Sequence, residues 1–313
     1  MIEPLNRLDP EVWPPQVILQ RASRPVIRWP NEARVAFWVA PNIEFYELYP
    51  PPNPIRAPWP RGTPDFLGHS SRDYGNRVGV WRCLEVFERH GIVGSVSLNA
   101  AMCERLPEVV DAFSGKGWEL FCHGLYNTRY LCGLNPDEEV RALRESIDII
   151  SRFSGRRVRG FLSPALMYTE STFVNAREVG FDYLFDVFNA DEPLPLRPVF
   201  GRMLSIPYQV ELNDFHVLVQ GGASPSRYVQ LFKQHFDRLY QEGVRSGRVV
   251  GLPLHPYVIG SPLYIGALDE MLAHVRAHDQ VWCATAEQIA DWYFEHYFDE
   301  AAAAVAAVER ERP

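Results

Sequence analysis

Four apolar runs of the sequence are each followed by a side chain that can exchange protons. These side chains are Glu44, His123, Asp186 and His255. Carboxylates and imidazoles are the groups that most often serve as general acids and bases near neutral pH. An apolar run gives no local reason to end in an imidazole, yet the chain does this twice. We therefore predict that these four residues are catalytic if the fold brings the ends of the runs together.

The runs before these residues belong to an alternating series of strands and helices. Strands are predicted at 34–41, 92–98, 118–122, 158–162, 183–187, 203–206, 215–219, 249–254 and 281–283. Helical patterns occur at 77–90, 136–153, 224–241, 263–278 and 286–297. The alternation predicts an α/β fold with a parallel sheet, closed as a distorted, TIM-like (β/α)7-type barrel. Since the loops after the strands of a barrel converge, the four side chains are expected to line one pocket.

Two of the predicted helices carry clear signals at their first residues. Asn135 can cap the helix at 136–153, and Thr285 forms a capping-box pair with Gln288 at the start of 286–297. The sequence therefore defines where these two helices begin.

The length of 313 residues fits either two domains or one barrel. No linker or change of composition interrupts residues 34–298, so we predict a single barrel domain there. Residues 1–33 are polar and are expected to wrap around the barrel as an arm. Residues 299–313 are Ala-rich and charged and are expected to form an exposed or frayed helical tail. Of the 26 prolines, 14 lie in the first 64 residues, which predicts a stiff arm and loop.

Several function classes are disfavoured by composition and by missing motifs. The formal net charge of −8 argues against a nucleic-acid partner. There is no signal peptide and no apolar stretch of membrane-spanning length, so we expect a cytoplasmic protein without a membrane partner. The five cysteines are never spaced C-x-x-C, which disfavours disulfides and a thiolate zinc site. P-loop, G-x-G-x-x-G and G-x-S-x-G motifs are also missing.

An aromatic and proline-rich loop at 45–66 follows Glu44 directly. Its rings include Phe45, Tyr46, Tyr49 and Trp59. Such a loop could cover a small planar substrate and exclude water, or it could simply pack on the barrel mouth. Slightly further on, His69 is expected to contribute to the same cover.

Ordered motifs across residues 30–297 resemble the polysaccharide deacetylase (NodB-homology, carbohydrate esterase-like) superfamily, and within it the allantoinase-like branch. The most specific segment is SRDYGNRVGVWRCLEVFERHGI at 71–92, in which Tyr74 and Arg77 are expected to contact the substrate. Further matches are NIE, ELFCHG, FDYLFD, IPYQVELND, LPLH and HDQVWCATAEQIADW. The resemblance implies a hydrolase that cleaves a carbon–nitrogen bond, often an amide, and a homo-oligomer such as a tetramer.

Metal-using members of this superfamily hold a divalent ion with an aspartate and two histidines of an H-x-x-x-H motif. By this resemblance His123 matches the first histidine, whereas Asn127 stands at the second. Glu44 matches the acidic position, Phe45 stands where many members have an adjacent acid, and Asn42 occupies the other possible position. Asparagine is a poor zinc ligand, so the conventional site is incomplete. Asn42, Phe45 and Asn127 are instead expected to contact the substrate.

The resulting hypothesis is a hydrolase without a cofactor. Glu44 orients and deprotonates water, His123 polarises the carbonyl or holds the water, His255 protonates the leaving nitrogen, and Asp186 positions an imidazole. Without a metal the carbonyl must already be activated, which favours a small cyclic ureide or imide. The segment SPALMYTEST after residue 162 is more apolar than expected for an allantoinase, so a wider class that includes other N-acyl compounds is retained.

Two alternatives remain. One is a carbohydrate N-deacetylase in which Glu44 and His123 hold zinc. The other is a barrel without catalytic activity that binds a small molecule.

Overall fold

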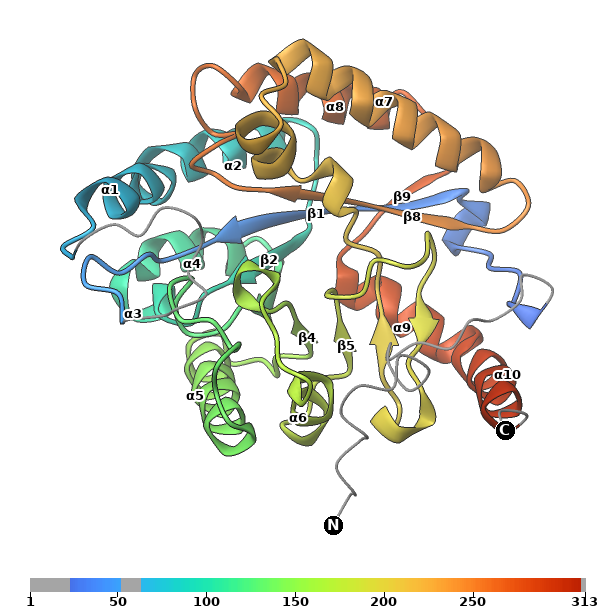
Figure 1. Cartoon of the computed structure of the whole chain (residues 1–313). Coiled ribbons are helices and arrows are strands. Elements are labelled where there is room, and N and C mark those ends of the chain that lie inside the picture. The colour runs from blue at the N-terminus through green and yellow to red at the C-terminus, as the bar shows by residue number, and fades with distance from the viewer. Residues whose placement is uncertain (1–22, 52–62, 311–313) are drawn as a thin grey trace.

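The structure is a computed structural model, and it describes residues 23–51 and 63–310. One sheet runs through the molecule (Figure 1). Its strands are β1 (Val35–Ile43), β2 (Ser95–Leu98), β3 (Glu119–Cys122), β4 (Gly160–Phe161), β5 (Tyr183–Leu184), β6 (Leu194–Pro195), β7 (Leu204–Ser205), β8 (Arg248–Leu254) and β9 (Val281–Cys283). Their order is β6-β7-β5-β4-β3-β2-β1-β8, with β9 paired to the start of β1.

The sheet is parallel apart from the pair β6–β7, and it curls into a half barrel. β1 pairs with β8 over most of its length, and pairs with β9 at its start and β2 at its end. Between the two ends of the sheet, Gln209 donates to the carbonyl of Val249 at 2.9 Å. The predicted α/β fold class is confirmed, and the distortion of the barrel lies in this gap. Isolated hydrogen bonds bridge it instead of a strand ladder, including one from the backbone N–H of Val249 to the carbonyl of Asp191 at 2.8 Å.

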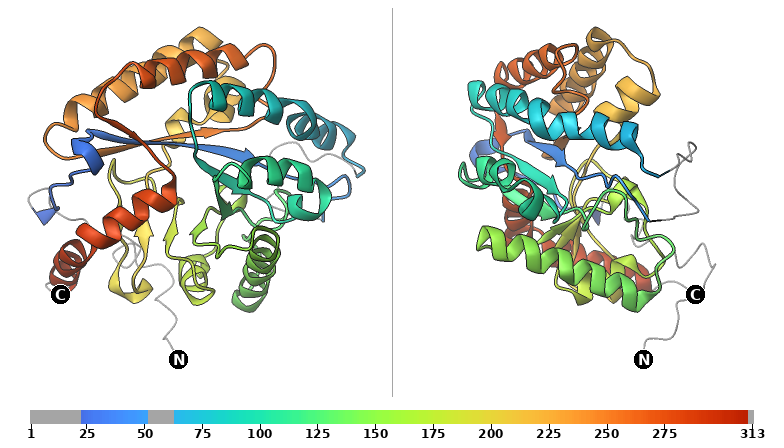
Figure 2. Two further views of the ribbon diagram at one scale, coloured as in Figure 1. Left: turned by 180° about the vertical axis from the view of Figure 1, so that it is seen from behind. Right: turned by 90° about the vertical axis from the view of Figure 1, so that its left-hand side faces the viewer.

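Helices cover the outer face of the sheet. They are α1 (Phe66–Tyr74), α2 (Val80–Arg89), α3 (Met102–Arg105), α4 (Pro107–Ser114), α5 (Pro136–Ser154), α6 (Thr172–Glu178), α7 (Pro225–Glu242), α8 (Ile265–Arg276), α9 (Ala286–His296) and α10 (Phe298–Arg310). A π-helical turn joins α1 to α2. The two further views in Figure 2 show α7 and α8 side by side over the edge formed by β1 and β8.

The helix starts follow the local signals in the sequence. Asn135 accepts a hydrogen bond from the backbone N–H of Glu138 while the Glu138 side chain reaches back, so α5 begins with a capping box. Thr285 and Gln288 form the same arrangement at the start of α9. Both predictions are confirmed.

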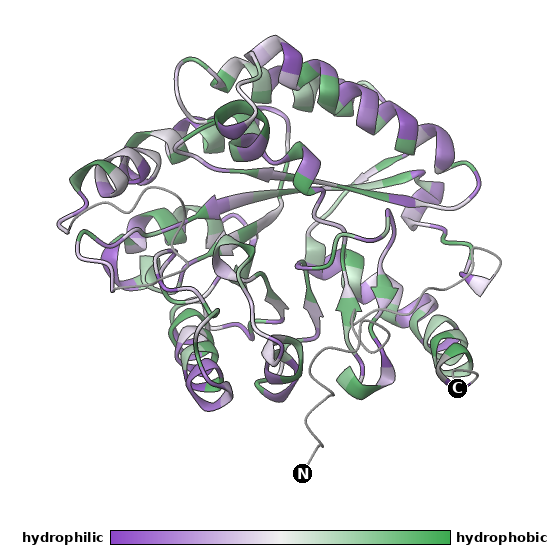
Figure 3. Ribbon diagram, viewed as in Figure 1, coloured by the Kyte–Doolittle hydropathy of each residue, from purple (hydrophilic) through white to green (hydrophobic). Residues whose placement is uncertain are grey.

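Aromatic side chains fill the inside of the curled sheet. Trp38, Phe121 and Phe185 are fully buried, with ring centroids 5.0 Å apart for Trp38–Phe185 and 4.5 Å for Phe121–Phe185. Every residue of β1 is buried, as expected for a strand covered on both faces. Figure 3 shows the resulting pattern of hydrophobic strands and helices with a hydrophilic outer face.

A buried carboxylate fixes the end of the sheet where the strands begin. Glu119 at the start of β3 accepts hydrogen bonds from Ser95 Oγ (2.6 Å), from the Tyr183 hydroxyl and from the backbone N–H of Glu287 (2.8 Å). The last contact places the carboxylate at the N-terminus of α9, where it satisfies a backbone N–H that has no partner within the helix. This network has a structural role and leaves the opposite end of the strands for the site.

One predicted strand is absent from the structure, and several observed elements were not predicted. Residues 215–219 were expected to be a strand but form a π-helical turn. Asn213 causes this turn, because its side-chain oxygen accepts from the backbone N–H of Phe215 (3.0 Å) and starts a helical conformation. The elements that were not predicted are the short strand β6 and the helices α1, α3, α4 and α6.

The arm and the tail pack on the domain wherever the structure describes them. Trp29 is 2% exposed and donates from Nε1 to the carbonyl of Arg248. The tail is the helix α10, as expected, but Ala301 and Val305 are buried, so one face of it packs instead of being exposed. Residues 1–22 of the predicted arm lie outside the described residues. Among the helices of the described residues, none has the length and apolarity needed to span a bilayer.

Candidate active site

Glu44 lies just beyond the C-terminal end of β1, between two imidazoles. Its Oε1 is 3.3 Å from Nε2 of His123 and 3.7 Å from Nε2 of His255. His123 follows β3 and His255 follows β8. All three side chains therefore lie at the C-terminal ends of parallel strands, where they meet. Each residue is less than 10% exposed. The structure thus brings together three of the four residues predicted to be catalytic.

The contact of His123 Nδ1 with the backbone shows which ring nitrogen carries a proton. Nδ1 lies 2.9 Å from the carbonyl oxygen of Leu162, which can only accept, so Nδ1 is the donor. Nε2 then faces the carboxylate of Glu44, which also accepts when it is ionised. One proton must therefore lie between Glu44 and His123 for this contact to be attractive. The pair is built to pass a proton or to share one with a bound water.

His255 is held by a residue that the sequence analysis did not select. Asp214 Oδ1 lies 2.7 Å from Nδ1 of His255, and Asp214 Oδ2 accepts the backbone N–H of His255 at 2.8 Å. Asp214 is fully buried. These contacts fix the ring and leave its Nε2 directed toward Glu44, which is the geometry of an oriented general acid.

The charges at the site shift two pKa values in opposite directions. Burial raises the pKa of Glu44, but the charge of His255 and the hydrogen bond of His123 outweigh burial and bring the pKa below its ordinary value. Burial lowers the pKa of His255, but the charges of Asp214 and Glu44 outweigh it and bring the pKa above its ordinary value. The two shifts therefore favour the ionised form of the carboxylate and the protonated form of the imidazole.

Asp186 lies beyond β5, but its carboxylate hydrogen-bonds Ser163 and not an imidazole, as had been expected. Its carboxylate accepts the backbone N–H of Ser163 at 3.0 Å and the Ser163 hydroxyl. The expected role in positioning an imidazole belongs to Asp214 for His255, because Asp214 follows the 3-10 turn Val210–Leu212, which packs against β8. Burial raises the pKa of Asp186 to about 6, while the Ser163 contacts and the charge of His123 act against this rise.

Two tyrosines and an arginine line the site next to Glu44. The Tyr46 hydroxyl donates to Glu44 Oε2 at 3.1 Å, and the Arg72 guanidinium lies 5.2 Å from the ring centroids of both Tyr46 and Tyr257. Burial and the charge of Glu44 raise the pKa of Tyr46, so its hydroxyl stays protonated. The Arg72 Nε atom is buried and makes no hydrogen bond with the described residues. A buried donor without a partner beside an acid–base pair is a candidate ligand for substrate oxygen.

The π-helical segment between α1 and α2 has glycine at two positions where a side chain would collide with the backbone. A Cβ atom at Gly75 would lie 2.5 Å from the backbone N of Tyr257, and one at Gly79 would lie 2.0 Å from the carbonyl oxygen of Pro256. The backbone of this π-helical turn therefore packs directly on the loop that follows His255. Asn76 in the same turn donates to the carbonyl of Glu44 at 2.8 Å. The segment thus fixes the positions of both Glu44 and His255.

Asn127 reaches the site, whereas Asn42 is used in packing. Asn127 Nδ2 donates to the Tyr46 hydroxyl, and its buried Oδ1 has no recorded hydrogen bond. Asn42 donates to the Tyr208 hydroxyl at 2.9 Å and to the carbonyl of Leu254 at 3.1 Å. The predicted substrate contact of Asn42 is therefore replaced by a link between β1 and β8, since its amide hydrogens are already bonded.

Phe45 and His69 lie beside the site and shape it. The backbone N–H of Phe45 donates to Asn99 at 2.9 Å, and the Phe45 ring lies 6.0 Å from the His69 ring. His69 Nδ1 is 2.8 Å from the carbonyl oxygen of Tyr46. His69 therefore holds the chain next to Glu44, but it does so from helix α1 and not from the covering loop in which it was expected.

Two further residues predicted to bind substrate point elsewhere, and one cannot be placed. The Tyr74 hydroxyl bonds Arg82, which in turn donates to the carbonyl of Gly260. Arg77 is 65% exposed and pairs with Asp73 one helical turn away. The structure therefore does not bring Tyr74 and Arg77 to Glu44, because they lie on other faces of the helical segment than Arg72 and Asn76. Trp59 lies outside the described residues.

The side chains at this site do not fit a conventional zinc centre. Asn127 stands at the second histidine position with its amide bonded to Tyr46. Zinc bound by imidazole needs donors that converge to about 2.0–2.1 Å from one point. Glu44, His123 and His255 are not a set whose ligand atoms all lie within 4.8 Å of one another, so the imidazoles flank the carboxylate rather than converge with it.

Comparisons with known proteins agree with this fold. The family model for polysaccharide deacetylases matches residues 70–184, which include α2, β3 with His123 and β5. A Schizosaccharomyces pombe protein is 26% identical over 310 residues, and its provisional name is polysaccharide deacetylase. The match covers 86% of this chain and 93% of that protein.

Two solved structures resemble the chain over most of their length. A protein of Pseudomonas aeruginosa PAO1 described as a probable polysaccharide deacetylase is 29% identical, with a TM-score of 0.77 and coverage of 87% of this chain and 95% of that one. The PuuE allantoinase is 27% identical, with a TM-score of 0.77 and coverage of 87% and 94%.

Proposed function

We propose that the chain is a hydrolase of the polysaccharide deacetylase superfamily that cleaves a non-peptide carbon–nitrogen bond in a small cyclic ureide, imide or other N-acyl compound. The observation that carries this proposal is the contact of Glu44 with two imidazoles whose opposite nitrogens are fixed by Leu162 and Asp214. The similarity to an allantoinase, which acts on a cyclic ureide, supports this substrate class.

In this reaction Glu44 orients the attacking water. The ionised carboxylate accepts a hydrogen bond from the water and takes its proton as the oxygen attacks the carbonyl carbon. Tyr46 donates to the other carboxylate oxygen and so fixes the orientation of Glu44. Proton transfer of this kind typically contributes about 10²–10⁴ in rate.

His255 supplies the proton that the leaving nitrogen needs. When the carbon–nitrogen bond breaks, the electron pair goes to nitrogen and the proton of His255 Nε2 goes with it. Asp214 holds the ring and stabilises its protonated form. The products are a carboxylic acid, or a carbamic acid from a ureide, and the freed amine or amide.

His123 and Arg72 face the charge that develops on the carbonyl oxygen. His123 presents an N–H group beside Glu44 when the proton shared between them lies on Nε2, and the Arg72 Nε donor has no hydrogen-bond partner among the described residues. Fixed donors aimed at a developing oxyanion can contribute several kcal/mol, of the order of 3 each. An arginine and an imidazole polarise a carbonyl less than a metal ion does, which favours a ring substrate with an activated carbonyl over a plain acetamide.

The competing proposal is a metal-dependent carbohydrate N-deacetylase. The provisional names of the fission yeast and Pseudomonas relatives favour it. The geometry around Asn127 and the two flanking imidazoles favours the reaction without a metal.

A hydrolysis assay on matched panels of cyclic ureides, imides and N-acetyl sugars tests the proposal. Wild-type protein is compared with Glu44→Gln and His255→Ala, and with Arg77→Gln as a surface control. We expect turnover of a ring or small N-acyl compound by wild type and the control, and loss in both site variants. Turnover of N-acetyl sugars alone, or activity that survives Glu44→Gln, would overturn the proposal.

A further inference from the structure

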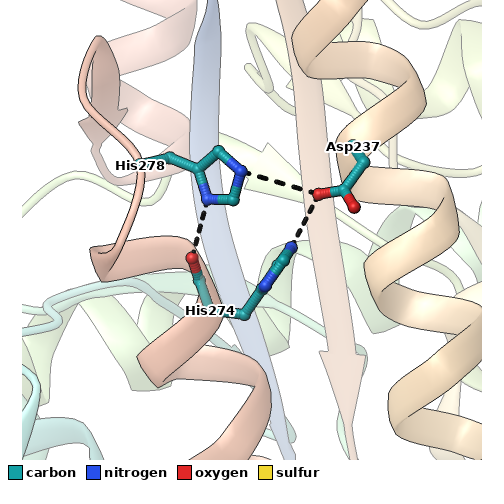
Figure 4. Close-up of side chains that lie close together, drawn as sticks. All are labelled: Asp237, His274 and His278. Atoms are coloured by element: carbon teal, nitrogen blue, oxygen red, sulfur yellow. Dashed lines mark hydrogen bonds and ion pairs between the residues drawn. The ribbon is translucent and has the colours of Figure 1, made fainter.

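A second group of histidines and a carboxylate lies between α7 and α8, away from Glu44. Asp237 comes from α7, His274 from the last turn of α8, and His278 from the turn that follows α8 (Figure 4). Their ligand atoms all lie within 4.8 Å of one another. The group is half-buried, with side-chain exposures of 43% for Asp237, 21% for His274 and 24% for His278.

The hydrogen bond made by His278 determines what its other nitrogen can do. Nδ1 lies 2.8 Å from the carbonyl oxygen of His274, so Nδ1 carries the proton of the neutral ring. Nε2 then presents a lone pair, and it faces Asp237 Oδ1 at 3.6 Å. Two acceptors directed at each other are held favourably by a cation between them. Histidine ligands of metals typically use their second nitrogen in this way, as donor to a carbonyl or carboxylate.

The distances are close to those of a zinc site. His274 Nε2 is 2.6 Å from Asp237 Oδ1, and His278 Nε2 is 3.6 Å from the same oxygen. Ligands at about 2.0–2.1 Å from a tetrahedral ion lie roughly 3.3 Å apart, between these two values. The Asp237 side chain is half-exposed, so its carboxylate has room to adjust around an ion, and solvent can supply the fourth ligand.

We propose that Asp237, His274 and His278 form a binding site for a divalent transition-metal ion, zinc foremost, that clamps α7 to α8. Two imidazoles and one carboxylate are ligands that suit zinc and disfavour magnesium or calcium. Phe236 and Tyr240 pack against the His278 ring, with centroids 5.1 Å and 4.9 Å away, and restrict its orientation.

The location separates this site from the hydrolytic one. His278 comes shortly before β9, which pairs with the start of β1, whereas Glu44 follows the end of β1. The two sites therefore lie at opposite ends of the strands. The ion at this place would stabilise the packing of two helices and would take no part in hydrolysis.

The chain offers a matched control. His90 Nε2 lies 2.8 Å from Asp269 Oδ1, which is also a contact between a histidine and an aspartate of neighbouring elements, but no second histidine completes it among the described residues. His90→Ala removes a pair of the same kind without removing a metal ligand. His278→Ala removes one ligand while leaving the 2.6 Å contact of His274 with Asp237 in place.

The test is a titration of metal-free protein with zinc chloride, followed by calorimetry and by thermal unfolding, and repeated with cobalt to record the absorption of tetrahedral Co²⁺. We expect one ion per chain at this site and a rise of a few degrees in the unfolding midpoint at a hundredfold excess over Kd. His278→Ala should lose both, whereas His90→Ala and Glu44→Gln should keep both.

Two results would overturn the proposal. One is a wild-type protein that binds no zinc at 100-fold molar excess and shows no tetrahedral cobalt spectrum. The other is undiminished zinc binding by a folded His278→Ala variant, because the ion would then sit elsewhere. Loss of binding in Glu44→Gln but not in His278→Ala would assign the ion to the hydrolytic site instead.

Discussion

Asp214 holds His255 by two contacts at once: one carboxylate oxygen lies 2.7 Å from the ring Nδ1, and the other accepts the backbone N–H at 2.8 Å. The carboxylate is fully buried, so both contacts act in a medium where electrostatic interactions are strong. The pair sets the tautomer, the orientation and the charge of the imidazole that faces Glu44.

Asp214→Asn should therefore move the pH dependence of activity. Asp214 raises the pKa of His255, so removing its charge lowers that pKa. If protonated His255 is the general acid, kcat/KM falls as pH rises through this pKa, and the alkaline limb should move to lower pH in the variant. We expect a loss of about 10²–10⁴ in kcat as well. A pH–rate profile measures both, and an unmoved alkaline limb would contradict the role of His255.

Arg72 and Arg77 provide a matched pair of substitutions on one helical segment. Arg72→Gln removes a buried donor beside Glu44 and should lower kcat/KM by about 10–100-fold, as expected for a hydrogen bond to a charged group. Arg77→Gln removes an exposed side chain and should change kcat/KM by less than about twofold. Steady-state kinetics on the same substrate decide this, and equal effects of the two changes would argue against a role for Arg72.

Asp186→Asn should increase stability at high pH but not at low pH. The folded-state pKa is about 6 because burial disfavours the ionised form. In the unfolded chain Asp186 loses this proton at a lower pH. The free energy of unfolding of the wild type therefore falls as pH rises toward 6, and the full loss of stability is present above pH 6. The variant lacks the charge and should gain about 1–3 kcal/mol in unfolding free energy at pH 8. Urea unfolding at pH 4 and pH 8 checks this, with little or no gain expected at pH 4.

Gly79→Ala should damage the site from a distance. Its Cβ would lie 2.0 Å from the carbonyl oxygen of Pro256, so the loop after His255 must move. We expect a stability loss of about 1–3 kcal/mol and a drop in kcat larger than the change in KM. Gly266→Ala is the control, because nothing lies within 4 Å of the added atom. A Gly79→Ala variant with normal kcat would show that the loop tolerates displacement.

The sequence was sufficient for Glu44, His123 and His255 because each follows an apolar strand of a parallel sheet. The position of such a residue depends on strand order alone, which the alternating pattern predicts. Asp214 was missed because FHVLV after it has the composition of a strand, whereas Asn213 starts a helical turn there. Arg72 and Tyr257 were missed because they meet only through the packing of α1 on the loop after β8. Helical spacing separates Arg72 and Asn76 from Arg77, and applying it would have corrected the substrate-binding prediction.

The most direct test of the central claim is turnover by protein stripped of metal. The assay uses a cyclic ureide or imide substrate in the presence of a chelator. The protein assayed carries the substitution His278→Ala, so that an ion between α7 and α8 plays no part. We predict that the metal-free His278→Ala protein keeps its kcat/KM, and that adding Glu44→Gln to this variant lowers kcat/KM by about 10²–10⁴. Loss of activity on stripping, with recovery on addition of zinc, would contradict hydrolysis by Glu44, His123 and His255 alone.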